Sequence, residues 1–503
     1  MAAAVPIVPG RGLGWMTLGL SLHTVISKIK SHPQDYPNID LSHSSSHPTT
    51  QPIILTLPAN GLRLRFDGPD QRLRLVEVLD FSKNSLAYKN TDLVKHARPM
   101  EDGQAPDPAQ ARPSFRHIYN RLFGPAYKGE YTPPETGHRR GTYTLSYPGL
   151  AFLFPIDHKS WSDKADFVSM LSSSATGPAT SMAIFEGSSW PEARSSLFGA
   201  STSLVEASQI IDSSTETSPP EISIVHLRGG GQLEFLRLNG HVTTVQLNET
   251  TPQDLVAEFG PPDAIYRKDD SRISIHATAQ PHSGRRRSSN ISPNLEPIDN
   301  ASRSSVRSYS GDSDASSISG IRRDEDDAQP AWTAECFYNY FHHASMRSFL
   351  IPRRITMDSS SLVVTKIILH GNIPSSYNFN RHRRLRWAIR LPNPNSQPQD
   401  PTSETPFSDI SSTLRRVWHS TYGSAEEEAQ QQRGMVLNRG WGDSSPDSSI
   451  EILGGFEEEG KEQTSAGQPR DQEMVSDTTE LFGFPGMLFE VLKNDAVSCL
   501  TLY

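Results

Sequence analysis

The chain has 503 residues, of which 35% are hydrophobic, and it carries a formal net charge of −9. This length exceeds what one ordinary hydrophobic core supports, and the low hydrophobic content indicates that much of the chain lies outside any core. We expect two or more folded units joined by disordered insertions. The negative net charge argues against a nucleic-acid-binding protein, so any surface that binds anions must be a local patch.

The chain has two cysteines, Cys336 and Cys499. This number excludes a disulfide scaffold and a cysteine-rich zinc site, and it suits a reducing compartment. The first residues, MAAAVPIVPGRGLGW, lack the basic start of a signal peptide, and no run of 18 apolar residues is present. We therefore expect a cytoplasmic protein without a transmembrane segment, or one that is peripheral on the cytosolic face of a membrane.

Four similar units follow one another, and each is predicted to be an amphipathic helix followed by antiparallel strands. In the first unit, the apolar face of the helix consists of Leu22, Val25, Ile26 and Ile29. Its strands are GLRLRFD from Gly61 and RLRLVEVLDF from Arg72, and the Gly68-Pro69-Asp70 between them is typical of a turn.

The second unit contains the stretch HIYNRLFGPAYKGEY, which resembles DLVAEFGPPDAIYRK of the third. Its predicted helical face consists of Phe115, Ile118, Tyr119, Leu122 and Phe123. Gly124 and Pro125 are predicted to end this helix, because glycine adopts the left-handed conformation and proline cannot continue a helix. The strands GTYTLSY and GLAFLFPID follow, from Gly141 and Gly149.

The third unit begins with Thr251 as a predicted helix N-cap, with Asp254 three residues later. Gly260 ends this helix, and the predicted strands are FYNYF and LVVTKIILH, from Phe337 and Leu362. The fourth unit has a helical face of Ile410, Leu414, Val417 and Trp418, followed by the strands GMLFEVL and SCLTLY.

One helix and a few strands cannot bury enough apolar surface alone, so the units must pack in pairs. We predict an α+β fold of two lobes, built from four helix-plus-sheet repeats with long disordered insertions. The predicted boundaries are 13–160 for the N-terminal lobe, 161–227 for a Ser-rich connector with strands such as SMAIFEG and EISIVHL, 228–278 with 332–392 for the third unit, and 407–423 with 481–503 for the fourth.

The insertions are predicted at 279–331 and at 424–480, and Pro392–Pro406 is similar in composition. The first is rich in Ser and Arg with almost no aromatic residues, and the second is acidic. Neither composition supports a packed core.

No pattern of catalytic or metal-binding residues is found. The 17 histidines form no His-Glu-x-x-His sequence, and no Gly-x-Ser-x-Gly sequence is present. The glycine-rich stretches GRGLG and RGGGQ lack the Lys-Ser/Thr of a phosphate-binding loop. We predict a protein that is not an enzyme and needs no metal or cofactor. An enzyme with an unrecognised site remains the alternative.

Five arginines near RLRWAIRL are the candidate binding residues: Arg381, Arg383, Arg384, Arg386 and Arg390. As a strand, this stretch would place Leu385, Trp387 and Ile389 on one face and arginines on the other. One guanidinium group can bind two phosphate oxygens at once, so this row of arginines is a candidate site for anionic lipid or a partner. A solvated strand face, or a surface paired with the acidic insertions, is the alternative.

Several blocks resemble the phagosome assembly factor 1 family: NGLRLRFDGPDQRLRLVEVLDFSKNSLAYKN, ECFYNYF, TKIILHGNIPSSYNFNRHRRLRWAIRLP and GFPGMLFEVLKNDAVSCLTLY. They occur in the family's order from about Leu18 to Tyr503. One departure is HHASMRSFLIPRRITMDSSS at 342–361, where the family continues directly into a strand.

The resemblance implies a non-enzymatic scaffold or adaptor in autophagy that acts with a WD-repeat β-propeller protein. It also implies association with phosphoinositides, chiefly phosphatidylinositol 3-phosphate, at the phagophore assembly site. A trafficking factor of the Golgi that does not contact lipid is the alternative that the resemblance leaves open.

Overall fold

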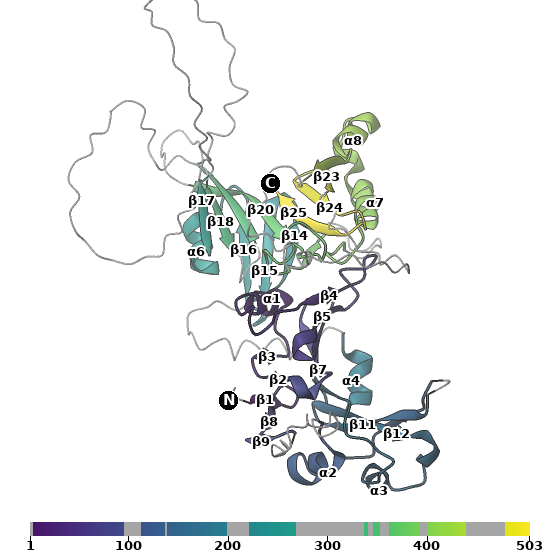
Figure 1. Ribbon diagram of the computed structural model, residues 1–503. Coiled ribbons are helices and arrows are strands. Elements are labelled where there is room, and N and C mark those ends of the chain that lie inside the picture. Colours follow the sequence, from purple (N-terminus) through teal and green to yellow (C-terminus); the bar gives the residue numbers. More distant parts are fainter. Residues whose placement is uncertain are drawn as a thin grey trace, which may run out of the picture. The chain divides into compact units, whose positions relative to one another are not determined.

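The computed structural model describes residues 4–94, 112–135, 138–198, 221–267, 336–340, 346–352, 362–391, 400–438 and 478–503 (Figure 1). These residues form helices and several mainly antiparallel sheets, so the predicted α+β class is confirmed. One compact unit comprises Met1–Tyr266 and Glu335–Tyr503 and is described below. The predicted insertion at 279–331 lies outside the described residues.

The first eight-stranded sheet has the order β10-β11-β12-β13-β7-β6-β5-β4. Two meanders of four strands form it, and their last strands, β7 and β13, pair antiparallel in the middle. The strands are β4 (Asp40–Ser42), β5 (Ile53–Leu57), β6 (Leu62–Phe66), β7 (Leu73–Val78), β10 (Glu130–Thr132), β11 (Arg140–Tyr147), β12 (Leu150–Asp157) and β13 (Ser181–Phe185).

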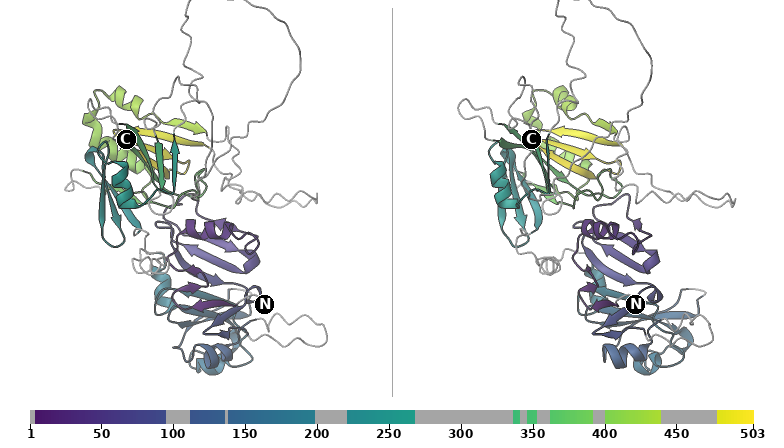
Figure 2. Two further views of the ribbon diagram at one scale, coloured as in Figure 1. Left: turned by 90° about the vertical axis from the view of Figure 1, so that its left-hand side faces the viewer. Right: turned by 60° about the vertical axis from the view of Figure 1, so that its left-hand side comes forward.

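Short helices cover this sheet. Helix α1 (Leu22–Lys30) buries the four apolar residues predicted for its inner face, and Ser21 caps it by accepting a hydrogen bond from the Thr24 amide. It lies against the strands of the first meander (Figure 2). The other helices here are α2 (Phe115–His117), which continues as a π-helical turn over Ile118–Leu122, α3 (Phe167–Leu171) and α4 (Trp190–Ser196).

The helix that starts at Phe115 ends as predicted, because Gly124 follows it with a φ of 82° in the left-handed region. A small mixed sheet beside it has the order β3-β2-β1-β8-β9. Its strands are β1 (Val5–Val8), β2 (Gly12–Leu13), β3 (Met16–Thr17), β8 (Leu86–Tyr88) and β9 (Thr91–Asp92).

The second eight-stranded sheet has the order β17-β18-β19-β20-β25-β24-β23-β22 and again joins two meanders through their last strands, β20 and β25. The strands are β17 (Ala264–Arg267), β18 (Cys336–Tyr340), β19 (Met346–Pro352), β20 (Leu362–His370), β22 (Met435–Asn438), β23 (Thr478–Phe484), β24 (Met487–Val491) and β25 (Val497–Leu502). Thus β19 lies in the segment where the sequence departs from the resembling family.

A four-stranded sheet of order β16-β15-β14-β21 shares a hydrophobic core with the second eight-stranded sheet. Phe259 of α6 contacts both, through Phe235 at 5.0 Å and Tyr340 at 5.9 Å between ring centroids. The remaining bounds are β14 (Ile222–Arg228), β15 (Gln232–Arg237), β16 (Val242–Gln246), β21 (Trp387–Ile389), α6 (Pro252–Phe259), α7 (Phe407–Trp418) and α8 (Ala425–Gln431).

The described residues contain two large cores, one formed from Ile7 to Ile184 with Phe379, and one from Ile222 to Leu502. Both eight-stranded sheets are pairs of four-stranded meanders, which agrees with units that pack in pairs. The number of repeats and the domain boundaries stay predictions. The strands expected within SMAIFEG and EISIVHL are present as β13 and β14, and β13 lies in the middle of the first sheet.

The expectation of an unstructured segment over 424–480 is wrong at its two ends. Ser424 caps α8 by accepting a hydrogen bond from the Glu427 amide, and acidic residues in the first turn favour a helix because its N-terminus is partly positive. Residues 435–438 form β22, which pairs with β23. Residues 439–477 lie outside the described part of the chain.

Candidate functional site

The five candidate arginines lie in and beside the loop 371–386, which joins β20 to β21. The apolar residues Leu385, Trp387 and Ile389 are buried, as the sequence predicted. The stretch is not one strand, however, because only Trp387–Ile389 forms β21. Arg383, Arg384 and Arg386 form ion pairs with carboxylates, so the five arginines do not form one continuous solvent-facing stripe.

Arg384 is the most deeply buried of the five, and only 1% of its side chain is exposed. Its Nε donates to the carbonyl oxygen of Pro69 at 2.5 Å, and its Nη1 donates to that of Gly371 at 2.7 Å. Its Nη2 contacts the Glu404 carboxylate at 3.1 Å. The guanidinium thus joins the β6–β7 turn, the loop 371–386 and the segment before α7.

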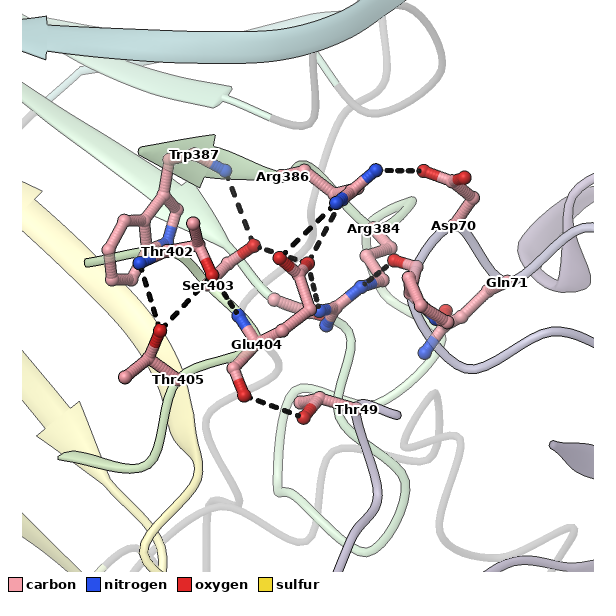
Figure 3. Close-up of polar contacts among 12 residues, drawn as sticks. Thr49, Asp70, Gln71, Arg384, Arg386, Trp387, Thr402, Ser403, Glu404 and Thr405 are labelled. Atoms are coloured by element: carbon pink, nitrogen blue, oxygen red, sulfur yellow. Dashed lines mark hydrogen bonds and ion pairs between the residues drawn. The ribbon is translucent and has the colours of Figure 1, made fainter. Parts of the chain in front are cut away.

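Arg386 shares the Glu404 carboxylate with Arg384 (Figure 3). Its Nε and Nη2 donate to the two carboxylate oxygens at 3.0 and 3.3 Å, and its Nη1 donates to Asp70 at 3.0 Å. The hydroxyl of Ser403 also donates to Glu404, at 2.8 Å. Backbone and side-chain hydrogen bonds between Ser403 and Trp387 hold Glu404 beside β21.

A second carboxylate, Glu221, lies just before β14 and binds Arg72 and Arg383. The Nη2 of Arg72 is 2.5 Å from a Glu221 oxygen, and Arg383 forms an ion pair with the other oxygen. Both arginines are largely buried. We call the set Arg72, Arg383, Arg384, Arg386, Asp70, Glu221 and Glu404 the arginine cluster.

Hydrogen bonds between uncharged residues also join the β6–β7 turn to the loop 371–386. Gln71 donates through its side-chain amide to the Asn372 carbonyl at 2.8 Å, and the Asn372 amide donates back to the Gln71 side chain at 2.8 Å. Asn372 also accepts from the Asn380 backbone amide at 2.6 Å. Because all three residues are buried, these bonds are protected from competition with water.

Two of the candidate arginines lie outside the cluster. The Arg381 guanidinium lies 4.7 Å from the ring centroid of Tyr377, which is a cation–π distance. Arg390 is the most exposed, with 44% of its side chain accessible, and pairs with Asp400 at 2.8 Å. A phosphate group could reach Arg390 without disturbing the cluster, whereas it would have to displace Glu404 to reach Arg384.

The charges of the cluster are set by burial and by one another. Burial lowers the pKa of Arg384, and the Glu404 carboxylate offsets part of this effect. Burial acts on Arg386 as well, but the Glu404 and Asp70 carboxylates outweigh it and raise its pKa. For Glu404, burial favours the neutral acid, but the two arginines prevail and lower the pKa below the ordinary 4.5. Burial also lowers the pKa of Arg72, to about 10.

The cluster is suited to fixing segments in place, because each of its carboxylates is held by at least one guanidinium. Losing one buried partner would leave the other charge uncompensated. Within the described residues, no group of three or more His, Cys, Asp or Glu side chains is arranged to hold a metal ion. No helix in the described ranges is long and apolar enough to span a membrane.

Sequence reasoning missed the acidic half of the cluster. Asp70 was predicted to be a turn residue, Glu221 lay at the end of the predicted connector, and Glu404 fell in a segment that resembled the disordered insertions. Asp70 and Arg386 are 316 residues apart in the chain, so no local spacing could connect them. The only sequence signal for Asp70, Glu221 and Glu404 is a carboxylate beside a tight turn or a short strand. This pattern is too common to identify a functional site.

Comparison with known proteins identifies relatives along the whole chain. The profile of the family described as "Phagosome assembly factor 1" matches residues 12–293 and 306–503. A PHAF1 protein of Arabidopsis thaliana is 22% identical over 513 aligned residues, covering 100% of this chain and 93% of the relative. A PHAF1 protein of Drosophila melanogaster is also 22% identical, covering 99% and 93%.

A PHAF1 protein of Caenorhabditis elegans is 30% identical over 138 residues, which cover 27% of this chain and 28% of the relative. No solved structure matches the chain. The family profile covers most of the sequence, including every element that forms the arginine cluster. The chain therefore belongs to the phagosome assembly factor 1 family.

Proposed function

We propose that this protein is a non-enzymatic adaptor in autophagy that acts in a complex with a WD-repeat β-propeller protein and is recruited to the phagophore assembly site. The observation that carries this proposal is membership of the phagosome assembly factor 1 family along nearly the whole chain. The arginine cluster supports it, since its carboxylates are engaged in ion pairs that fix one segment against another.

The test is affinity purification of the intact chain from its native cell, with identification and quantification of the proteins that co-purify. A stoichiometric WD-repeat protein is the expected result. Repeated purification without such a partner would contradict the proposal and favour the alternative of a Golgi trafficking factor. Catalytic turnover that survives removal of all co-purifying proteins would instead favour an enzyme.

We further propose that the adaptor contacts membranes containing phosphatidylinositol 3-phosphate through the arginine stretch 381–390. Arg381 and Arg390 are the candidates for this contact because they lie outside the arginine cluster, and 44% of the Arg390 side chain is exposed. Each basic residue near an anionic surface contributes about 1 kcal/mol, so the association should be weak and sensitive to salt.

Flotation of the full chain with liposomes containing phosphatidylinositol 3-phosphate tests this contact. The double variant Arg381→Ser with Arg390→Ser should reduce the floated fraction several-fold, because two basic residues are lost from the surface. The control, Arg63→Ser with Arg65→Ser, removes two half-exposed arginines on β6 and should leave flotation unchanged. Equal flotation with neutral liposomes would contradict the lipid contact.

A further inference from the structure

The outer strands of the two eight-stranded sheets differ in charge. Asp40 lies in β4, Glu130 in β10 and Arg267 in β17, so three of the four outer strands carry a charged residue. The fourth, β22, has the sequence MVLN and carries none. Because charges on an outer strand hinder pairing with a further strand, β22 lacks the protection that the other three have.

The side chains of β22 are also unusually exposed for apolar residues. Met435 is 67% exposed and Val436 is 66% exposed. Neighbouring residues of a strand point to opposite faces of the sheet, so β22 presents an apolar group on each face. Among the described residues, β22 pairs only with β23, which leaves its other side without a neighbouring strand.

A hollow of about 400 Å³ lies beside this strand. Val436 lines it together with Phe407 of α7 and Phe482 of β23, whose rings are 4.6 Å apart between centroids. Its wall is thus partly aromatic and can accept an aliphatic side chain from a strand placed next to β22. Lys493, Asp495 and Glu480 also line the hollow, so its charged side chains leave one net negative charge.

The charge around β22 indicates what kind of strand would fit. Glu480 of β23 lies directly opposite Val436 in the strand register, and it is exposed. No residue in the described ranges forms an ion pair with it. Helix α8, which ends four positions before β22 begins, adds Glu426 and Glu427 on its exposed surface. The edge strand is therefore apolar and has the Glu480 carboxylate beside it on the face of the hollow, while exposed Arg433 lies two positions before the strand begins.

We propose that β22 is a docking edge for an extended segment of a partner protein, which adds to the sheet as a further strand. Because Val436 and Glu480 are cross-strand partners that both line the hollow, they lie on one face, and on that face the segment carries aliphatic and basic residues two positions apart. An aliphatic side chain enters the hollow beside Val436, and a basic side chain reaches over β22 to Glu480. This proposal does not depend on the proposed role in autophagy, because it rests on the edge strand, the hollow and the charge.

The test uses the full chain and a fluorescein-labelled peptide of sequence VTKTVTK, whose valines and lysines share one face of a strand, with binding followed by fluorescence anisotropy. Val436→Lys should weaken binding about tenfold or more, because it removes the apolar contact that Val436 makes with the bound peptide and its positive charge repels the lysines of the peptide. Glu480→Gln should weaken binding about two- to fivefold, as expected for loss of one cross-strand charge pair. The matched control is Val242→Lys, which changes a valine 49% exposed on the outer strand β16 and should leave binding unchanged.

Two further peptides separate strand addition from simple charge attraction. VTKTVTK methylated on alternate backbone nitrogens keeps its charge but cannot form a complete strand ladder, so it should not bind. VTETVTE should bind more weakly than VTKTVTK because its carboxylates lie on the same face as Glu480.

Equal binding of the methylated peptide, or no binding of VTKTVTK, would overturn the proposal. Light scattering that shows a dimer disrupted by Val436→Lys would mean that a second copy occupies the edge, which would also overturn it. The same holds if VTKTVTK binds only after residues 440–477 are replaced by a short Gly-Ser linker, since the chain itself would then cover β22.

Discussion

Substitution of Glu404 by Gln removes the carboxylate that Arg384 and Arg386 share while keeping nearly the same shape. Arg384 is 1% exposed and Glu404 is 14% exposed, so solvent cannot replace the lost charge. Removing one partner of a buried ion pair typically costs 3–5 kcal/mol, and the retained amide oxygen still accepts a hydrogen bond. We expect the free energy of unfolding to fall by about 3 kcal/mol.

Urea unfolding followed by tryptophan fluorescence measures this loss, because buried Trp387 is hydrogen-bonded to Ser403 beside the cluster. Glu77→Gln is the matched control. Glu77 also binds two arginines, Arg63 and Arg65, but these are 32% and 30% exposed. Water screens such pairs, so the control should lose about 1 kcal/mol or less. Equal losses in the two variants would refute the argument that burial makes the Glu404 contact strong.

Three further outcomes follow from the same coordinates. Because the pKa of Glu404 is lowered in the folded protein, the stabilisation by its carboxylate is present above pH 4.5 and is lost as the pH falls through the lowered pKa. In urea titrations, the difference in free energy of unfolding between wild type and Glu404→Gln should therefore become smaller as the pH is lowered. Gly149→Ala should destabilise the folded protein by about 3 kcal/mol or more, since Gly149 has a φ of 72° and an added Cβ would lie 2.1 Å from the Gly10 nitrogen. The control Gly240→Ala should cost about 1 kcal/mol, because Gly240 has a φ of 81° but open space around it. Equal shifts of the melting temperature in the two variants would contradict this reasoning. Thr251→Ala should cost about 1 kcal/mol by breaking the capping box with Asp254, and Thr251→Ser should restore most of it in thermal denaturation.

Local patterns in the sequence were sufficient for four of the helices and for many of the longer strands. The helical spacing of Leu22, Val25, Ile26 and Ile29 predicted the buried face of α1, and the Thr251 cap predicted the start of α6. These features are local because a helix depends on side chains three or four positions apart and on the hydrogen bonds of its own ends. Alternating apolar residues predicted many of the longer strands, because successive side chains of a strand point to opposite faces of the sheet and this pattern is also local.

The environment of the arginines could not be predicted in this way. The sequence of 384–391 correctly indicated that Leu385, Trp387 and Ile389 are buried, but it predicted that the arginines would lie together on an open strand face. Whether a charged side chain is exposed depends on which carboxylates the fold brings to it. Glu404 and Asp70 lie in segments whose sequences indicated no contact with the arginines.

The sequence by itself determined helices α1, α2, α6 and α7, many of the longer strands and the family, because these depend on neighbouring residues and on the order of sequence blocks along the chain. Only the tertiary structure decided that the meanders join through β7 with β13 and β20 with β25, that Arg384 is buried against Glu404, and that β22 is left at an edge. Contacts between residues hundreds of positions apart are set by the packing of whole sheets, and no short stretch of sequence contains that information.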